Sequence, residues 1–259
     1  MPELPEINIM GRYLESTSLN KKIVGMEILQ TALLQAPKKD FEFLRGKTFK
    51  EVRQLGKYLF LKVEEQRWLG FHFGMTGKFE SYKNQDPPKY THLIFTFEDD
   101  SHLAFVCRRK LGKIYLTSGV EDFQRKHSLG KHALELKLKE FQEILKDKKG
   151  MIKAVLTDQH EISGIGNVYA DEMLYQCNIH PKSGTNSLTE EEIKDLYSKM
   201  VEVLKTVIKS DGERSELPSD YLVPHRKDGA DCPKCDGKVV KTKVSGRSTY
   251  FCPSCQKEK

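Results

Sequence analysis

The sequence lacks the features that mark membrane, secreted and disordered proteins. No run of 18 apolar residues occurs, and the first thirty residues contain no apolar stretch after a basic start. A membrane span and a secretion signal are therefore not expected. Only 10 prolines and 18 glycines are present, and apolar residues make up 38% of the chain, which is typical of globular proteins. We expect a cytoplasmic protein without a membrane partner.

A strong excess of one charge is also missing. The 43 Lys and Arg residues exceed the 37 Asp and Glu residues by 6. This balance does not separate a nucleic-acid-binding protein from an ordinary basic protein. The 259 residues suffice for one large domain or two modest ones, each with its own core.

The six cysteines are few and unevenly distributed. Cys107 and Cys177 are isolated, whereas the other four form two Cys-x2-Cys pairs with 16 residues between them: Cys232, Cys235, Cys252 and Cys255. Two such pairs supply four thiolates in tetrahedral geometry, which is typical of a closed structural zinc site. A redox role for the pairs is the less favoured alternative. The pattern predicts one structural Zn²⁺, and we expect no organic cofactor.

The first half of the chain has strand character. A helix is expected over Pro5–Glu15, with proline in the first turn and apolar residues on one face. Short runs rich in β-branched and aromatic residues follow, separated by turn residues. We expect strands at Lys22–Leu29, Thr48–Arg53, Tyr58–Val63, Trp68–Phe73, His92–Phe97, His102–Val106 and Ile114–Leu116. This spacing predicts a β-sandwich.

From about Ser118 the periodicity becomes helical. Helices are predicted over Ala133–Lys146, Met151–Asp158, Val168–Cys177 and Glu190–Lys209. A polar stretch, Ser210–Asp220, leads to the cysteine-rich tail, where Lys238–Val244 and Ser248–Phe251 can pair as a hairpin that turns at Ser245-Gly246. The fold class is therefore α+β. We divide the chain into a β-sandwich domain over 1–118, a helical domain over 119–220 and a zinc finger over 221–259.

The segment Gly164-Ile165-Gly166-Asn167 lies between two predicted helices. Its glycines would let backbone amides approach a phosphate, and Asn167 could cap the helix or contact the phosphate. A tight interhelical turn with an asparagine cap explains the same residues without any ligand.

The N-terminal hexapeptide Met1-Pro2-Glu3-Leu4-Pro5-Glu6 also has two interpretations. Prolines and acids are normal in a first helical turn. If Met1 is removed, however, Pro2 becomes a secondary amine with a reference pKa near ~8, which can attack a sugar carbon and form an iminium. Glu3 would then be placed to move protons.

Three further segments carry basic or apolar residues at turns. Lys57 in Gly56-Lys57-Tyr58 is most simply a solvated strand end, and Arg108-Arg109-Lys110 a solvated charge run. Met75 lies in the glycine-flanked loop Phe73–Gly77; methionine usually fills cores, but on such a loop it could also enter a base stack.

Taken together, these segments resemble the formamidopyrimidine-DNA glycosylase / endonuclease VIII family over essentially the whole chain. The matching pieces are MPELPE at 1–6, GKYL at 56–59, HFGMTG at 72–77, the long segment from Ile152 to Pro181 and GRSTYFCPSCQ at 246–256. The resemblance implies a helix–two-turn–helix module around Gly164–Asn167. It also implies a base-excision-repair enzyme that removes oxidised bases from double-stranded DNA and cleaves the abasic site by β,δ-elimination.

The resemblance also implies roles for individual residues. Pro2 would be the nucleophile, Glu3 the general acid/base, Lys57 a second proton donor and phosphate contact, and Glu6 a support for the N-terminus. Asn167 and Arg247 would hold the phosphates that flank the lesion. Met75, Arg109 and Leu111 would fill the gap left by the flipped base. A monomer is expected.

The sequence departs from the formamidopyrimidine branch in three places. Leu111 stands where phenylalanine is usual, and Cys107-Arg108 replaces Asp-Pro. The loop expected to close over 8-oxoguanine reads SDGERSELPSDY at 210–221, without the branch's glycine–threonine run. Ring-opened purines, hydantoins or oxidised pyrimidines are therefore expected in preference to 8-oxoguanine.

Two other function classes remain open at this point. A protein of the same fold could bind damaged DNA without cutting it, although binding alone requires neither Pro2 nor Glu3. A zinc-ribbon protein of transcription or translation would explain the four cysteines but not the N-terminal hexapeptide.

Overall fold

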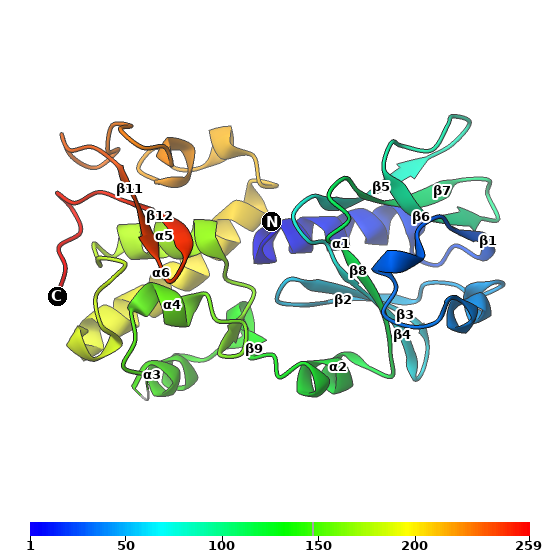
Figure 1. The fold of residues 1–259 in the computed structure, drawn as a ribbon, viewed down its shortest axis with the longest axis horizontal. Coiled ribbons are helices and arrows are strands. Elements are labelled where there is room, and N and C mark those ends of the chain that lie inside the picture. The colour runs from blue at the N-terminus through cyan, green and yellow to red at the C-terminus, as the bar shows by residue number, and fades with distance from the viewer. Residues whose placement is uncertain (147) are drawn as a thin grey trace. The chain divides into compact units, whose positions relative to one another are not determined.

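The computed structural model describes residues 1–146 and 148–259, which form two compact units. The first unit comprises Met1–Pro2 and Glu6–Ser128, and the second comprises Glu3–Pro5 and Leu129–Lys259 (Figure 1). Three residues near the start of the chain thus belong to the unit formed by its second half. Within the described ranges, no helix combines the length and apolar composition needed to cross a bilayer.

The first unit contains helix α1 (Leu4–Ser18) from Glu6 onward and two antiparallel sheets, drawn as separate layers in Figure 1. One sheet has the order β1 (Ile23–Ile28), β6 (Thr91–Phe97), β7 (His102–Cys107), β5 (Gly77–Tyr82). The other has the order β2 (Glu51–Leu55), β3 (Tyr58–Glu64), β4 (Arg67–His72), β8 (Lys113–Thr117). Helix α2 (Val120–Lys126) follows. The predicted β-sandwich is confirmed.

Phenylalanines from both sheets form the centre of this core. The ring of Phe71 on β4 meets those of Phe79 on β5 and Phe105 on β7 at centroid distances of 4.8 and 5.3 Å. All three side chains are at most 5% exposed. The first pair packs edge to face and the second is tilted. An edge-to-face pair adds about 0.5–1.5 kcal/mol to the burial of apolar area. The sandwich therefore gives a rigid base to the loops at the ends of its strands.

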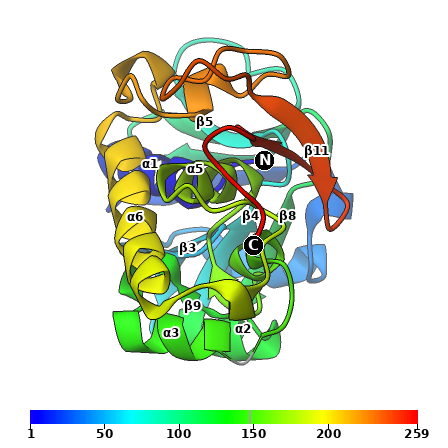
Figure 2. The same cartoon turned by 90° about the vertical axis from the view of Figure 1, so that its left-hand side faces the viewer.

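The second unit is helical. It contains α3 (Leu138–Lys146), α4 (Ile152–Leu156), α5 (Asn167–Gln176) and α6 (Glu190–Lys209), with a two-strand parallel pair of β9 (Lys131–His132) and β10 (Ile162–Ser163). Helix α6 begins with a capping box in which Thr189 and Glu192 satisfy each other's backbone amides. Figure 2 shows α5 beside α6, and the apolar faces of both helices are buried in one core.

The tail of the second unit forms the predicted hairpin. Strands β11 (Val240–Val244) and β12 (Arg247–Phe251) pair antiparallel, and Val244 lies opposite Arg247. The two turn residues Ser245 and Gly246 have φ of 48° and 76°. Positive φ at both positions is the type I′ pattern, which matches the twist of a two-residue hairpin.

Several predicted boundaries were wrong. The helix expected over Ala133–Lys146 begins only at Leu138, after a 3-10 turn at Ala133–Glu135, and the one expected over Met151–Asp158 is shortened to Ile152–Leu156. Strand β5, helix α2 and the 3-10 helix Lys38–Leu44 were not predicted. Strand β5 becomes a strand through its long-range pairing with β7, which local composition does not encode.

Candidate active site and zinc centre

Glu3 caps helix α5. Its carboxylate accepts hydrogen bonds from the backbone amides of Gly166 at 2.9 Å, Val168 at 2.8 Å and Tyr169 at 3.2 Å. These amides belong to the first turn, where no intrahelical acceptor is available. The positive end of the helix dipole also favours the charged carboxylate. The residue is 3% exposed, so the start of the chain is fixed to the helix at this point.

The two glycines of the Gly164–Asn167 segment make this contact possible. Gly164 has a φ of 114° and its carbonyl accepts the backbone N–H of Leu4 at 3.1 Å. A Cβ on Gly166 would lie 2.2 Å from the Cδ atom of Glu3. Only a residue without a side chain leaves room for the carboxylate at the helix start.

Asn167 is not the cap of α5. The N-cap position is Gly166, which makes no side-chain hydrogen bond, and the amide Nδ2 of Asn167 donates to the carbonyl of Ser248 at 2.6 Å. The interhelical turn is therefore capped by a residue distant in sequence, and the asparagine cap considered for this segment is wrong. Asn167 instead connects the start of α5 to strand β12.

A buried group of charges also joins α5 to the hairpin. Asp171 on α5 lies 2.5 Å from the Nζ atom of Lys153 and accepts from Arg226 at 2.8 Å. The backbone amide of Tyr250 donates to the same carboxylate at 3.1 Å, and Lys153 donates to Thr249 at 2.6 Å. Burial raises the pKa of the Asp171 carboxyl, and the two neighbouring cations act in the opposite direction.

Arg247 lies at the first position of β12. Its side chain is exposed, and Nη1 donates to the hydroxyl of Thr157 at 3.0 Å. Asn167 and Arg247, which the sequence predicts as phosphate contacts, thus both attach to the region where α4, α5 and the hairpin meet in the second unit.

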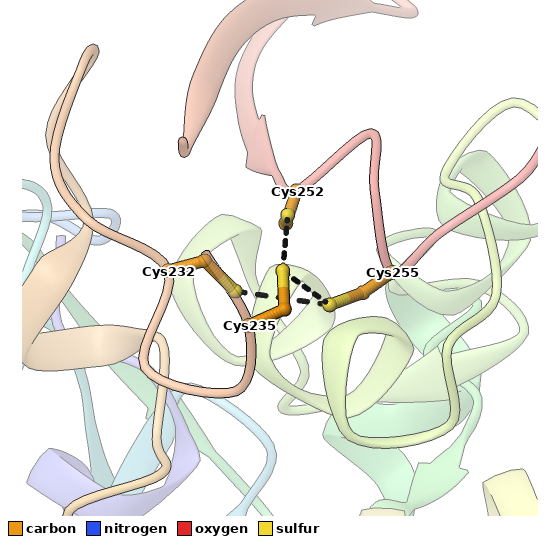
Figure 3. A group of neighbouring side chains, drawn as sticks. All are labelled: Cys232, Cys235, Cys252 and Cys255. Carbon is orange, nitrogen blue, oxygen red and sulfur yellow. Dashed lines mark hydrogen bonds between the residues drawn. The ribbon is translucent and has the colours of Figure 1, made fainter. Parts of the chain in front are cut away.

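The four predicted zinc ligands converge on one point (Figure 3). Their Sγ atoms all lie within 4.8 Å of one another, with separations of 3.7 Å for Cys232–Cys255 and Cys235–Cys252 and 3.4 Å for Cys235–Cys255. A tetrahedral Zn²⁺ with Zn–S distances of about 2.3 Å places its sulfur ligands about 3.8 Å apart. The residues present therefore fit a structural zinc ion.

Groups around the sulfurs orient this site. The Tyr175 hydroxyl lies 3.0 Å from Cys232 Sγ, and the backbone amide of Gly237 donates to Cys235 Sγ at 3.3 Å. The ammonium of Lys234 lies 4.6 Å from the centre of the Tyr175 ring. Such outer contacts fix ligand orientation and offset thiolate charge. Because Tyr175 lies on α5, the metal site is connected to the helix that Glu3 caps.

In the first unit, Lys57 lies in the two-residue turn between β2 and β3. Leu55 and Tyr58 are paired, and Gly56 has a φ of 53°, which suits glycine. Gln54 donates to the carbonyl of Gly56 at 2.9 Å and accepts from Asn8 on α1 at 3.2 Å. Lys57 is only 6% exposed, so its interpretation as a solvated strand end is wrong.

Sequence reasoning did not identify His72, which lies opposite Tyr58 at the end of β4. Its Nδ1 accepts the backbone N–H of Gly74 at 3.3 Å, and its ring lies 5.0 Å from that of Tyr58. Burial, followed by the nearby charge of Lys57, lowers the pKa of His72 to about 4. A neutral imidazole therefore stands beside Lys57. His72 is the first residue of the segment HFGMTG, and that segment could have identified it as a candidate site residue.

The structure brings Met75, Arg109 and Leu111 onto neighbouring loops. Gly74 has a φ of 57°, and a Cβ on it would lie 2.6 Å from the backbone of Leu111, so the two loops pack backbone to backbone. The amide of Arg109 donates to the Thr76 hydroxyl at 3.2 Å. Met75 and Leu111 are 42% and 49% exposed, which is unusual for large apolar side chains and suits a binding surface.

Three other residues of the N-terminal hexapeptide are at least partly accessible. Met1 is 49% exposed, and Pro2 and Glu6 are half-buried. Pro2 directly precedes the anchored Glu3. Its nitrogen can therefore lie no farther from Glu3 than one residue of backbone allows.

Three family models match the chain in the order of these elements. The formamidopyrimidine-DNA glycosylase N-terminal domain matches residues 1–114, the H2TH domain of the same enzymes matches 129–219, and the zinc finger found in FPG and IleRS matches 231–257. The chain belongs to the formamidopyrimidine-DNA glycosylase family. Members of this family are base-excision-repair DNA glycosylases with AP lyase activity, so this protein is an enzyme of that class.

Individual relatives span the full length. The formamidopyrimidine-DNA glycosylase of Pelotomaculum thermopropionicum is 34% identical over 276 residues, and that of Streptococcus mutans is 34% identical over 274; each alignment covers 100% of both chains. A structure of the wild-type Lactococcus lactis enzyme with DNA containing N7-benzyl-Fapy-dG matches with a TM-score of 0.91 and 31% identity, covering 99% of this chain and 100% of the other. The L. lactis enzyme bound to DNA with an AP site matches with a TM-score of 0.90, 32% identity and the same coverage.

Proposed function

We propose that this glycosylase removes oxidised bases from double-stranded DNA and cleaves the resulting abasic site through an imine at Pro2. The observation that carries the proposal is the fixation of Glu3 on α5, which holds the residue next to the nucleophile in one place. Binding of DNA alone would not require a buried carboxylate at this position.

In the proposed reaction, removal of Met1 converts the Pro2 nitrogen from an amide into a secondary amine. The amine attacks C1′ of the flipped nucleotide, and the bond from C1′ to the base breaks as the base leaves with a proton. Ring opening of the sugar gives an iminium between Pro2 and C1′. The iminium acidifies the C2′ protons, so β-elimination expels the 3′ phosphate and δ-elimination then expels the 5′ phosphate.

We assign the proton transfers to residues of this chain. Glu3, held as a carboxylate by three backbone amides, serves as general acid/base at the deoxyribose. Lys57 serves as second proton donor and phosphate contact, and the turn that buries it to 6% exposure fixes where its side chain begins. Glu6 supports the N-terminal turn.

DNA contacts are assigned to both units. Asn167 and Arg247 hold phosphates that flank the lesion, and Met75, Arg109 and Leu111 occupy the gap in the base stack. In domain terms, we propose a catalytic β-sandwich over 1–118, a DNA-binding helical domain over 119–220 and a zinc finger over 221–259. The zinc ion, when bound to its four cysteines, stabilises the hairpin that carries Arg247.

The segment 210–221 supports a preference for lesions other than 8-oxoguanine. It is held against the second unit at both ends: Gly212 donates to the carbonyl of Val207 at 3.1 Å, and Gln176 donates to that of Asp220 at 3.3 Å. Leu217 and Tyr221 are 9% and 3% exposed. Residues 213–216 and 218–220 are exposed, but the two held ends and the two buried side chains leave only short pieces of chain to close over a flipped base. We propose ring-opened purines, hydantoins or oxidised pyrimidines as the preferred substrates.

We also propose that the protein acts as a monomer in the cytoplasm, where a reducing environment keeps zinc-binding thiols available.

Borohydride trapping tests the function. Protein with a confirmed N-terminal Pro2 is incubated with duplexes that carry an abasic site, 8-oxoguanine, a ring-opened purine or an oxidised pyrimidine. A covalent adduct mapped to Pro2 by mass spectrometry is expected, with more adduct on the ring-opened purine than on 8-oxoguanine. Protein that retains Met1 is the matched control and should give no adduct.

Absence of an adduct on the abasic duplex, with Pro2 confirmed as the first residue, would contradict the imine mechanism. Tight lesion binding under those conditions would instead favour a damaged-DNA-binding protein of the same fold.

A further inference from the structure

Arg108 and Tyr90 form an exposed pair beside the loops that carry Met75 and Leu111. The guanidinium carbon of Arg108 lies 5.9 Å from the centre of the Tyr90 ring. Tyr90 is 53% exposed, and Arg108 is also exposed. Neither residue has a role in the function proposed above.

The turn after β7 directs its two arginines to different neighbours. The backbone amide of Lys110 donates to the carbonyl of Cys107 at 3.0 Å. This bond closes a four-residue turn with Arg108 and Arg109 at its centre. The backbone of Arg109 is bound to Thr76, in the loop of Met75. The side chain of Arg108 lies over Tyr90. Arg108 and Tyr90 are therefore connected to the loop of Met75 through the neighbouring residue Arg109.

The backbone of Tyr90 is strained and held in place. Its φ is 66°, a region that aromatic residues rarely adopt, so the backbone is strained at this residue. The amide of Cys107 donates to the Tyr90 carbonyl at 3.0 Å, and His92 Nε2 lies 2.9 Å from the Cys107 carbonyl. The strand contacts thus maintain a conformation that leaves a large ring in solvent. Strain of this kind is concentrated at binding sites.

We propose that Arg108 and Tyr90 form an additional contact to the sugar–phosphate backbone of duplex DNA, next to the gap occupied by Met75. This inference rests on the proposed function. A guanidinium binds phosphate oxygens in a planar, bidentate manner, and stacking on Tyr90 holds that plane in place. The Tyr90 ring offers its remaining face to a sugar or an exposed base.

The test is binding of an uncleavable abasic-analogue duplex and of an undamaged duplex, measured across salt concentrations. Arg108→Ala is expected to weaken both complexes about 5–20-fold near 0.1 M salt and to reduce the log–log salt slope by about 0.9, the value for one phosphate contact. Tyr90→Asn removes the ring while suiting the positive φ, and Tyr90→Phe keeps the ring. The asparagine variant should lose affinity and the phenylalanine variant should retain it.

Arg67→Ala is the matched control, because Arg67 lies 4.7 Å over the Phe43 ring and forms a comparable cation–ring pair on the same unit. It should leave affinity and salt slope unchanged. The affinity of the double variant Arg108→Ala/Tyr90→Asn for DNA should fall by less than the product of the fold-losses of the two single variants, since each residue positions the other.

Wild-type affinity and an unchanged salt slope in Arg108→Ala would overturn the inference, as would an equal loss in Arg67→Ala. Borohydride trapping of the wild-type protein is measured in parallel. A wild-type protein that traps abasic DNA while Arg108→Ala binds normally refutes this contact alone, whereas a wild-type protein that gives no adduct refutes the proposed function.

Discussion

The Gly166 amide donates a 2.9 Å hydrogen bond to the carboxylate of Glu3, 163 residues earlier in the chain. The absence of a side chain on Gly166 is what admits this carboxylate, since a Cβ there would lie 2.2 Å from Glu3 Cδ. The turn at Gly164–Asn167 thus begins helix α5 and also binds Glu3, the residue that follows the proposed nucleophile.

Gly166→Ala should displace Glu3 while the fold persists, because a glutamate side chain can rotate away from a new methyl group. The hydrogen bonds to three amides would break or lengthen, and we expect the free energy of unfolding to fall by about 3 kcal/mol. Borohydride trapping should fall at least about tenfold. Gly150→Ala is the control, because a Cβ at Gly150 meets no atom within 4 Å. Equal trapping by the two variants would show that the Glu3 anchor does not position Pro2.

Asp171→Asn should be strongly destabilising. The substitution leaves the ammonium of Lys153, which is 1% exposed, and the guanidinium of Arg226 without their shared counter-charge. Removal of one partner from a buried ion pair costs about 3–5 kcal/mol. Urea unfolding measures the loss. Glu161→Gln, which breaks the partly exposed pair with Lys148, should cost no more than about 1 kcal/mol. Similar losses of unfolding free energy in both variants would show that the buried ion group around Asp171 stabilises the fold no more than the partly exposed pair does.

Removal of zinc should weaken DNA binding without unfolding the first unit. The four thiolates would no longer be held together, and the ends of the hairpin that carries Arg247 would no longer be fixed by the metal. We expect affinity for an abasic duplex to fall at least about tenfold after chelation, with metal loss verified by elemental analysis. Cys177→Ser, a change outside the ligand set, should bind DNA normally. Full affinity after verified metal loss would contradict the proposed role of the finger.

His72 should contribute to stability in a pH-dependent manner. Its pKa is lowered from 6.5 to about 4 in the folded state, so between these values the unfolded chain binds more protons. The contribution is fully present above pH 6.5, is lost as the pH falls towards 4, and amounts to at most about 3 kcal/mol. Chemical unfolding at about pH 7 and about pH 4.5 is compared for the wild type and His72→Gln. The wild type should lose more stability than the variant, and equal losses would show that His72 is not held neutral.

Alternating composition was sufficient to predict most strands of the sandwich and the β11–β12 hairpin. The matched spacing of the four cysteines was sufficient to predict the metal site, because both ligand pairs are local in sequence. Strand β5 was not predicted, since its pairing with β7 brings together residues that are distant in the chain. A pattern within one segment shows only the periodicity of that segment. It could not predict β5, because this strand depends on a distant partner.

Charged residues were the main source of error at the candidate site. Lys57 looked like a surface residue but is buried in a turn held by Gln54 and Asn8. The association of Lys153 with Asp171 and Arg226 depends on how two helices and the hairpin pack, and no spacing in the sequence reports it. Glu3 was predicted as a site residue from its place after Pro2 and from the resemblance, but its contact with the start of α5 was not predicted.

The capping of α5 by Glu3 also has a consequence for biosynthesis. The N-terminal proline leaves the ribosome first, but its neighbour is anchored only after residues 166–169 have been made and α5 has formed. A chain interrupted before that point carries the amine without the contact that positions it. Truncated products should therefore be poor at forming imines with abasic DNA, which restricts strand cleavage to molecules whose synthesis has passed residue 169.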